Sequence, residues 1–270
     1  MEHIVAGTLD ALSVTELSES FDDLHLNLER VRFATPEGIV AMVTKLEKIA
    51  RSGTSVLVSA PTSDNVSNYL ARAHVPHILD GLDIRHGFGS VREWHQGNQL
   101  IELQMFSSSS EVHALATSVH AFAEPHGADI AAQLFSAVCE AGENVSFHAE
   151  TTHGYVMAQY FPNRGDFGFA IGDSGVGFLG SLSRIGATDH DSALAMAVAP
   201  GVSATGERNR GYGLSSIRDN VSGLGGSFKI FGGNRKLSFG SGCAPTGSKG
   251  AFVGVQAGSL VSCVLPTRRA

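Results

Sequence analysis

Cysteine is scarce in this chain, and its three copies, Cys139, Cys243 and Cys263, do not have the spacing of a metal site. An odd number of widely separated cysteines fits a reducing compartment better than a disulfide framework. No apolar run approaches the roughly 20 residues that a membrane-spanning helix needs. Residues 1–6 lack the basic start and apolar core of a signal peptide. We therefore expect a cytoplasmic protein with no membrane partner.

Clustered positive charge is also scarce. The chain has 19 Lys and Arg against 26 Asp and Glu, which gives a net charge of −7. Proteins that bind nucleic-acid phosphates need clustered Lys and Arg, and here the basic groups are small, such as Arg208-Asn-Arg210. We therefore expect no nucleic-acid partner. With 270 residues, of which 43% are hydrophobic, the chain has the length for two compact domains.

The first 97 residues have the pattern of a small α/β domain. Thr35 and Pro36 predict a helix start, because Thr is a good N-cap and Pro suits the first helical position. The apolar side of this helix ends before Ser52-Gly53. The predicted elements are strands at 4–6 and 24–28, a helix at 36–51, a strand at 55–59 and a helix at 64–73. Alternation of strands and helices over this length predicts an α/β unit.

Residues 26–38, the helix that follows, Gly53, the next strand and residues 65–73 resemble the STAS-type domains of anti-sigma-factor antagonists. In that family the loop before the first long helix carries a phosphorylatable Ser or Thr. The corresponding position is Thr35, although the usual Asp-Ser-Ser/Thr-Gly is replaced by Phe33-Ala-Thr-Pro-Glu-Gly38. Thr35 thus has two interpretations, a plain N-cap and a phosphosite.

The second predicted domain covers residues 98–270, after a linker near 95–98. Its central feature is a long helix at 130–148, on which Val138, Ala141 and Val145 share one face. The other predicted elements are strands at 100–106, 155–161, 167–171, 228–231, 236–239, 251–255 and 260–265, and helices at 112–123, 193–199 and from 214 onwards.

Three motifs of this domain carry polar or glycine residues at wide spacing. Glu140 and Asn144 are one helical turn apart, so their oxygens point into the same space and can hold Mg²⁺ with waters. Asp173-Ser-Gly-Val-Gly177 ends an apolar strand, and its glycines allow close approach of the backbone to a ligand. Gly211-Tyr-Gly-Leu214 precedes a helix, whose first N–H groups favour phosphate.

Taken in order, these motifs resemble the N, G1 and G2 boxes of the GHKL superfamily of ATPases and kinases. The resemblance covers residues 100–267. It implies a Bergerat-type two-layer α/β sandwich, with a mixed sheet and helices on one face, and the cofactors ATP and Mg²⁺. A homodimer is compatible with this superfamily.

The resemblance assigns a role to each matching residue. Asn144 would bind Mg²⁺, Glu140 would be the general base or orient the attacking hydroxyl, and Asp173 would accept a hydrogen bond from the adenine amino group. Gly175 and Gly177 would pass close to the adenine. The residues expected at the phosphates are Gly211, Gly213 and Leu214 at the helix start, and Thr205, Arg208 and Arg210 in a lid at 201–210.

A carboxylate at Glu140 resembles the anti-sigma-factor serine kinases and gyrase-type ATPases rather than the sensor histidine kinases. The resemblance therefore implies transfer of the ATP γ-phosphate to a Ser or Thr of a partner, STAS-type or sigma-factor-like, or of the chain's own N-terminal domain. The alternative is an ATP-gated switch or ATPase that controls protein association without phosphotransfer.

The sequence also offers three other interpretations, at Glu143, at Ser174, and at His74 with His77. Glu143 lies three residues after Glu140 and offers a second carboxylate on the helix. Ser174 lies in a Gly-Asp-Ser-Gly sequence, which can mark a protease nucleophile, but that reading needs a triad and an oxyanion hole. His74 and His77 suggest a metal, but no third ligand is in range. We favour the nucleotide site over the protease and the metal.

Overall fold

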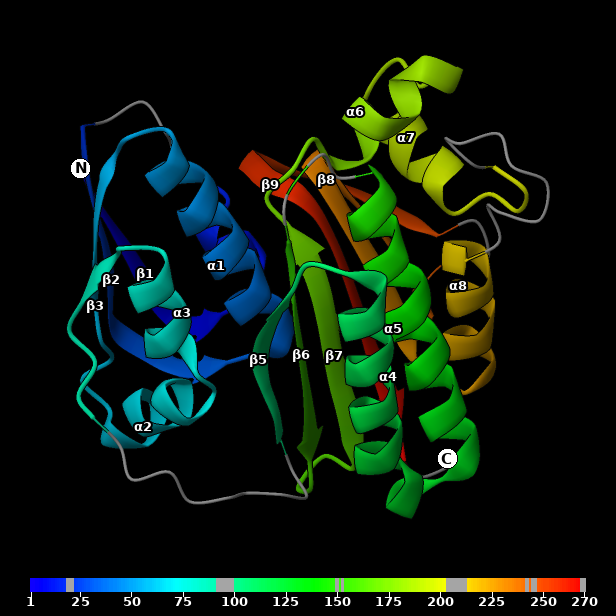
Figure 1. Cartoon of the computed structure of the whole chain (residues 1–270), viewed down its shortest axis with the longest axis horizontal. Helices are drawn as coiled ribbons and strands as arrows, with labels where there is room; N and C mark the ends of the chain where they lie inside the picture. Colours follow the sequence, from blue (N-terminus) through cyan, green and yellow to red (C-terminus); the bar gives the residue numbers. More distant parts are fainter. Residues whose placement is uncertain are drawn as a thin grey trace.

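The computed structural model of the chain contains two β-sheets with helices packed against them (Figure 1). The first sheet has the strand order β1-β2-β3-β4, and the second has the order β5-β6-β7-β9-β8. The predicted α/β class is confirmed at this level. The structure describes residues 1–17, 22–90, 100–148, 151, 153–202, 213–240, 243 and 247–267.

The strands of the first sheet pair in parallel, from β1 through β4. Parallel neighbours need a crossover connection, which α1 supplies between β2 and β3, and α2 and α3 supply between β3 and β4. The predicted order of strand, helix, strand and helix is confirmed, and α3 and β4 are added to it. The elements are β1 (Glu2–Leu9), β2 (Asp23–Ala34), α1 (Pro36–Arg51), β3 (Ser55–Ser59), α2 (Asp64–Arg72), α3 (Val75–Gly81) and β4 (Arg85–His86).

Helix α1 starts and ends where its sequence predicts. The Thr35 hydroxyl accepts a hydrogen bond from the Gly38 N–H at 3.0 Å, and Pro36 occupies the first turn. The C-cap is Ser52, followed by Gly53 at φ +92°. Most of the helix surface is buried, on every side. A helix buried all round belongs inside a protein rather than on its surface.

The second sheet is antiparallel throughout its described pairs, so the predicted mixed sheet is wrong. The predicted strands at 100–106, 155–161 and 167–171 and the central helix are confirmed within a few residues. The elements are β5 (Leu100–Phe106), α4 (Ser109–Ala123), α5 (Ala128–His148), β6 (Gly154–Phe161), β7 (Asp166–Asp173), α6 (Gly177–Leu182), α7 (His190–Ala197), α8 (Gly213–Gly223), β8 (Ser227–Gly240) and β9 (Ser248–Pro266).

Two long strands replace the four short strands predicted near the end of the chain. β8 has 14 residues and β9 has 19, and they pair as one hairpin. The glycines that interrupt the apolar pattern lie at shifts of the register, on either side of Gly233. Such irregularities bend a strand without ending it, which is why the sequence pattern breaks where the strand does not.

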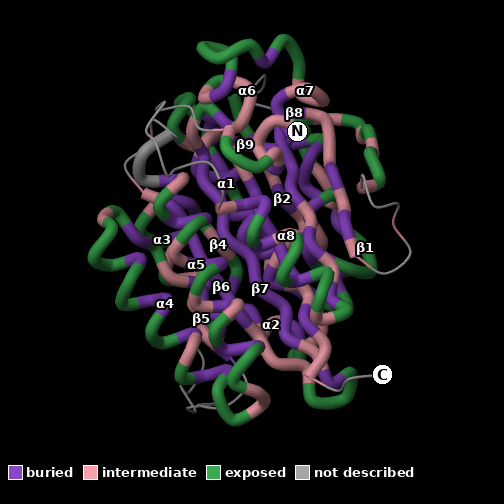
Figure 2. The backbone as a smooth tube through the Cα atoms, turned by 90° about the vertical axis from the view of Figure 1, so that its right-hand side faces the viewer, coloured by how far each residue is buried: buried purple, intermediate pink, exposed green. Residues whose placement is uncertain are grey.

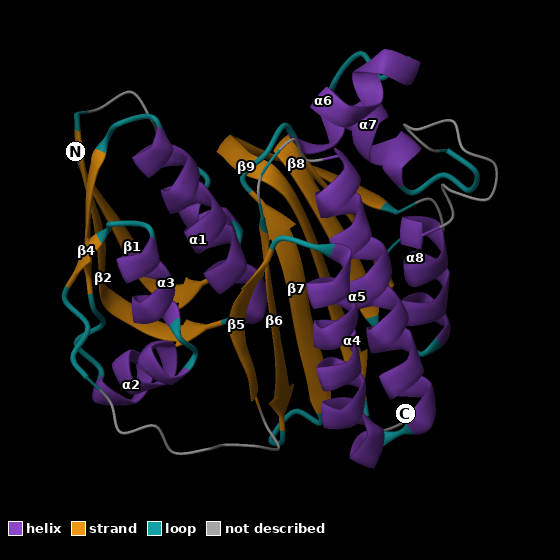
Figure 3. Ribbon diagram, viewed as in Figure 1, coloured by secondary structure: helices purple, strands orange, loops and turns teal. Residues whose placement is uncertain are grey.

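The two faces of the second sheet pack against different helices (Figures 1 and 3). Phe167, Phe169 and Ile171 of β7 share a hydrophobic cluster with α4, α5 and α8. Ala170, which points the other way along the pleat, belongs to the cluster that contains α1. Helices α4, α5 and α8 of this unit therefore lie on one face, as predicted, and α1 from the N-terminal part of the chain covers the opposite face.

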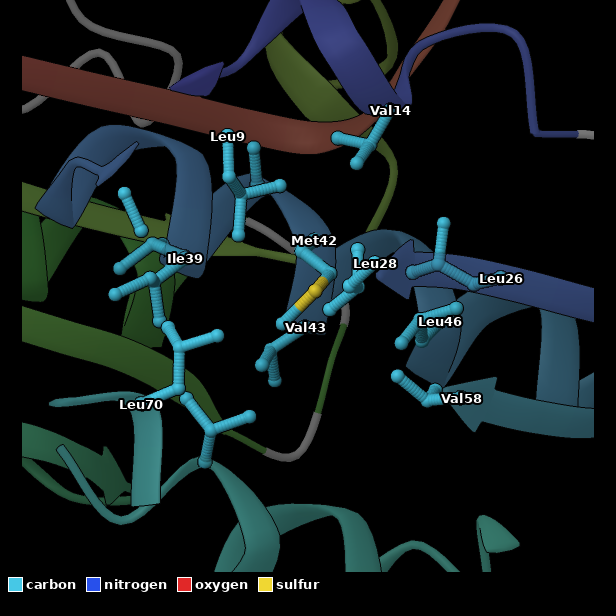
Figure 4. Close-up of a cluster of buried hydrophobic side chains, with 14 of the residues drawn as sticks. Leu9, Val14, Leu26, Leu28, Ile39, Met42, Val43, Leu46, Val58 and Leu70 are labelled. Carbon is cyan, nitrogen blue, oxygen red and sulfur yellow. The ribbon is translucent and has the colours of Figure 1, made fainter. Parts of the chain in front are cut away.

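Helix α1 lies between the two sheets and joins them in one hydrophobic cluster. Figure 4 shows its Leu46 beside Leu26 and Val58 of the first sheet. The same cluster includes Tyr155, Met157, Ala170, Phe231 and Leu260 of the second sheet. Figure 2 shows the buried backbone running through the middle of both parts. The predicted domain boundary lies in residues 91–99, outside the described residues, so it stays a prediction.

None of the helices within the described ranges combines the length and the apolar character needed to cross a bilayer.

Candidate functional site

Asp173 is the last residue of β7, and its side chain is completely buried. Oδ1 accepts a hydrogen bond from the Gly175 N–H at 2.7 Å, and Oδ2 accepts from the Ser259 N–H at 3.3 Å and from the Ser259 hydroxyl. Burial raises the pKa of Asp173 to about 6, although these hydrogen bonds act in the opposite direction. A buried carboxylate with a pKa near neutrality is a common feature of functional sites.

The glycine loop after Asp173 is pressed against β9. Gly177 has φ +68°, and a Cβ on it would lie 2.7 Å from the Gly258 carbonyl oxygen. Gly258 has φ +56°, and a Cβ there would overlap the Asp173 carbonyl and carboxylate. Both positions therefore require glycine, for their conformation and for the space. Gly175 lies between Asp173 and Gly177 in the chain, is half-buried, and donates its N–H to Asp173.

Glu140 of α5 lies against the start of α8. A Cβ on Gly213 would overlap the Glu140 carboxylate and lie 3.2 Å from the Glu140 Cβ. Glu140 is exposed, whereas Leu214, the next residue of α8, is 5% exposed and packs into the core. The first and third motifs are therefore brought together, although 73 residues separate Glu140 and Gly213 in the chain.

Asn144 lies one turn after Glu140 and is half-buried. Val138, Ala141 and Val145 are buried, as the predicted apolar face of this helix requires. The Glu140 carboxylate and the Asn144 carboxamide therefore lie on a side of α5 that is less buried. Two oxygen-bearing side chains one turn apart, beside a helix N-terminus, suit Mg²⁺ that keeps waters and binds phosphate oxygens.

Several predicted contacts fall on residues that the structure does not describe. Thr205, Arg208, Arg210 and Gly211 lie in the segment 203–212, which is outside the described ranges. In the described part of the chain, no group of three or more His, Cys, Asp or Glu side chains gathers to hold a metal ion. His74 and His77 lie with their ring centroids 6.4 Å apart and belong to no such group.

Thr35 is far from the other predicted site residues. Its hydroxyl caps α1 and also donates to the Leu9 carbonyl at 3.3 Å. The next residue, Pro36, lies near Gly168, close to the start of β7, whereas Asp173 ends that strand. Five residues of strand span about 16 Å. Thr35 therefore lies at the other end of β7, on the sheet face opposite to α5.

The sequence-based interpretation missed a polar cluster behind Asp173. Ser174 is 8% exposed, too buried to act as a protease nucleophile on a bound peptide. Its buried hydroxyl lies near the Glu47 carboxylate of α1 without a hydrogen bond of good geometry between them, and it helps to lower the pKa of Glu47. Glu47 lies at the end of a regular apolar helix, so no sequence motif marked it. No signal in the sequence sets it apart, because the same helix also carries the charged Lys45 and Lys48.

A cavity lies away from Glu140 and Asn144, which do not line it. It has a volume of about 370 Å³ between the end of α1 and strands β3 and β4, and Glu47, Arg51 and Arg85 line it.

Comparison of the chain with family models, with curated proteins and with solved structures found no match to any of them. The functional argument therefore rests on the residues and their geometry.

Proposed function

We propose that the second unit binds Mg-ATP in a GHKL-type site and transfers the γ-phosphate to a Ser or Thr of a partner protein. The single observation that carries this proposal is the contact of the Glu140 carboxylate with Gly213. Residues from distant motifs meet there, at a helix N-terminus, with Asn144 one turn away. A carboxylate beside a phosphate-binding helix start is where a general base or an orienting group is needed.

Each residue has a role in this proposal. Asn144 holds Mg²⁺, and Glu140 accepts the proton of the attacking hydroxyl or orients it. Asp173 accepts a hydrogen bond from the adenine amino group, and Gly175 and Gly177 let the loop approach the base. Mg²⁺ supplies neutralisation of charge on the phosphates, so the protein's contribution is mainly positioning.

The acceptor is best sought on another molecule. Thr35 caps α1 and lies on the sheet face opposite to Glu140, so a transfer within one chain would need the two units to separate. We propose a STAS-type or sigma-factor-like regulatory protein as the partner, with a second copy of this chain, in a homodimer, as the next candidate.

A switch without phosphotransfer is the second candidate function. It is favoured by the hydrophobic cluster that joins α1 to the sheet bearing Asp173. Nucleotide binding at one face of this sheet and docking of the N-terminal unit on its other face can influence each other through the strands. In this proposal ATP controls the association of the chain with a partner or with itself.

Incubation of the pure protein with γ-labelled ATP and Mg²⁺, with and without STAS-type proteins, separates the two functions. Label on a Ser or Thr supports the kinase, whereas binding without label and an ATP-dependent change in mass support the switch. Asp173→Ala is expected to abolish nucleotide binding, and Glu140→Ala to retain binding and lose turnover. A folded wild-type protein that does not bind Mg-ATP would refute both functions.

A further inference from the structure

Helix α1 makes polar contacts with the second sheet at both of its ends. Near its start, Glu37 accepts hydrogen bonds from Lys229 at 3.1 Å and from the Ser262 hydroxyl at 2.5 Å. Near its end, Glu47 contacts His153, which precedes β6, and lies near Ser174, which follows β7. Buried polar pairs add little net stability, but they penalise any other docking position. The position of α1 on the sheet is therefore specified at two points.

The Glu47 carboxylate is completely buried, and Oε1 lies 2.6 Å from His153 Nε2 and 2.8 Å from Arg51 Nη2. His153 Nε2 is also 3.1 Å from the Tyr155 hydroxyl. Burial raises the pKa of Glu47, but the interactions with His153, Ser174 and Arg51 outweigh it and lower the pKa. Glu47 is therefore held as a carboxylate by residues from both units.

Ser174 directly follows Asp173, the last residue of β7, and Asp173 pairs with Gly154, the first residue of β6. Asp173 follows Phe169 and Ile171, which face α5 and α8. Ala170 faces α1, and His153, which contacts Glu47 of α1, precedes the residue that pairs with Asp173. Glu47 therefore lies near the buried Ser174, without a hydrogen bond between them. At the start of the glycine loop, Ser259 thus binds the Asp173 carboxylate, while Glu47 binds His153 beside the paired residue Gly154.

We infer that Glu47 is a positioning residue for the loop at 173–177, through which the N-terminal unit sets the affinity of the nucleotide site. The inference rests on the proposed function for the identity of the ligand, but the contact between Glu47 and His153 does not depend on that function. Removal of Glu47 takes the carboxylate away from His153, which adjoins Gly154, the partner of Asp173 in the sheet, and such a largely buried polar group moves to find another partner. Asp173, paired with Gly154, moves with it.

Glu37 provides a matched control. It is a carboxylate on the same helix, and it also bonds to the second sheet. Its carboxylate binds Ser262, which pairs with Ala170 in the middle of β7, three strand residues before Asp173. If α1 acts only by holding the units together, substitutions at Glu37 and Glu47 have equal effects on nucleotide binding. If Glu47 positions the loop, only the Glu47 variants weaken binding.

The test compares Glu47→Ala, Glu47→Gln and Glu37→Gln in the full chain. Mg-ATP affinity is measured by calorimetric titration, and hydrogen exchange of the Gly175 amide is measured without nucleotide. We expect Glu47→Ala to bind Mg-ATP about ten-fold more weakly, as is typical of coupling between sites, and to exchange the Gly175 amide faster. We expect Glu37→Gln to match the wild type in both measurements. Glu47→Gln has the same shape and keeps the fold if Glu47→Ala does not.

The Glu47→Gln variant has an additional readout in the pH profile. The groups facing Glu47 are Arg51, His153, Tyr155 and Ser174, and the charge of Glu47 contributes to the raised pKa of Asp173. Loss of that charge lowers the pKa of Asp173. The acid limb of Mg-ATP binding therefore moves to lower pH in Glu47→Gln and does not move in Glu37→Gln. A change of fold stability alone would not produce this shift.

The outcomes separate this inference from the proposed function. If the Glu47 variants bind Mg-ATP as tightly as the wild type and exchange the Gly175 amide at the same rate, the inference is overturned and the nucleotide site is unaffected. Equal weakening by Glu37→Gln overturns it as well. A wild type that does not bind Mg-ATP, combined with faster Gly175 exchange in Glu47→Ala, overturns the proposed function and supports the positioning role.

Discussion

Opposing physical effects set the ionisation of Asp173. Burial disfavours its charged form, whereas the N–H groups of Gly175 and Ser259 and the Ser259 hydroxyl favour it. The resulting pKa of about 6 lies above the ordinary value of 3.8. The Asp173 side chain therefore binds a proton more tightly in the folded protein than in the unfolded chain.

This difference predicts a pH dependence of stability. The contribution of protonated Asp173 is complete below about pH 3.8 and is lost as the pH rises through about 6. We expect the free energy of unfolding of the wild type to fall across this window, relative to Asp173→Asn, by up to about 3 kcal/mol. Urea unfolding of both proteins at several pH values between the two limits measures it. Parallel pH curves for wild type and variant would contradict the assignment to Asp173.

Gly213 gives a second prediction, because its neighbour is the proposed catalytic group. A Cβ at this position overlaps the Glu140 carboxylate, which is the mobile end of a side chain and can rotate away. We expect Gly213→Ala to fold with a loss of about 1 kcal/mol or less, because alanine also favours a helix. Turnover of ATP should fall at least as far as in Glu140→Ala. Near-wild-type turnover in Gly213→Ala would separate Glu140 from the chemistry.

Secondary-structure elements show how far local sequence rules extend. Helix α1 begins and ends where its Thr-Pro start and Ser-Gly end predict, because capping is a local interaction. Strands β8 and β9 were predicted as four pieces, because glycines and polar residues interrupt their apolar pattern. Their continuity comes from ladder hydrogen bonds with partner strands, which the pattern of one segment does not contain.

The start of α1 yields a prediction that separates the two interpretations of Thr35. As an N-cap, its hydroxyl satisfies the Gly38 N–H. We expect Thr35→Ala to lower the free energy of unfolding by about 1 kcal/mol, and Thr35→Ser to retain most of it. Neither substitution should change the incorporation of label from γ-labelled ATP into this chain. Loss of label in Thr35→Ala, together with label on the serine in Thr35→Ser, would identify a phosphosite instead.

Across the entire chain, the decisive feature is the burial of α1 between two sheets. Residues of both sheets meet around it in one cluster, so each unit covers apolar surface of the other. Tyr155, Met157 and Leu260 would face water if the N-terminal unit were absent. The burial of such side chains contributes about 1.5–3 kcal/mol each.

We therefore predict one cooperative unfolding transition for the full chain. Calorimetry and urea unfolding, followed by two spectroscopic probes, should give coincident transitions. The separate fragment 98–270 should aggregate or unfold at a lower temperature than the full chain, and addition of fragment 1–97 should restore part of its stability. Two well-separated transitions in the full chain would show that the units fold independently.

Local interactions made much of this protein readable from its amino-acid order alone. The cap at Thr35, the apolar face of α5 and the glycine loop after Asp173 each depend on residues a few positions apart. Three relations depend on the tertiary structure instead. They are the contact of Glu140 with Gly213, the packing of α1 on the second sheet, and the contact of Glu47 with His153. Each joins segments far apart in the chain, and packing of the two units, rather than any local pattern, decides which of them meet.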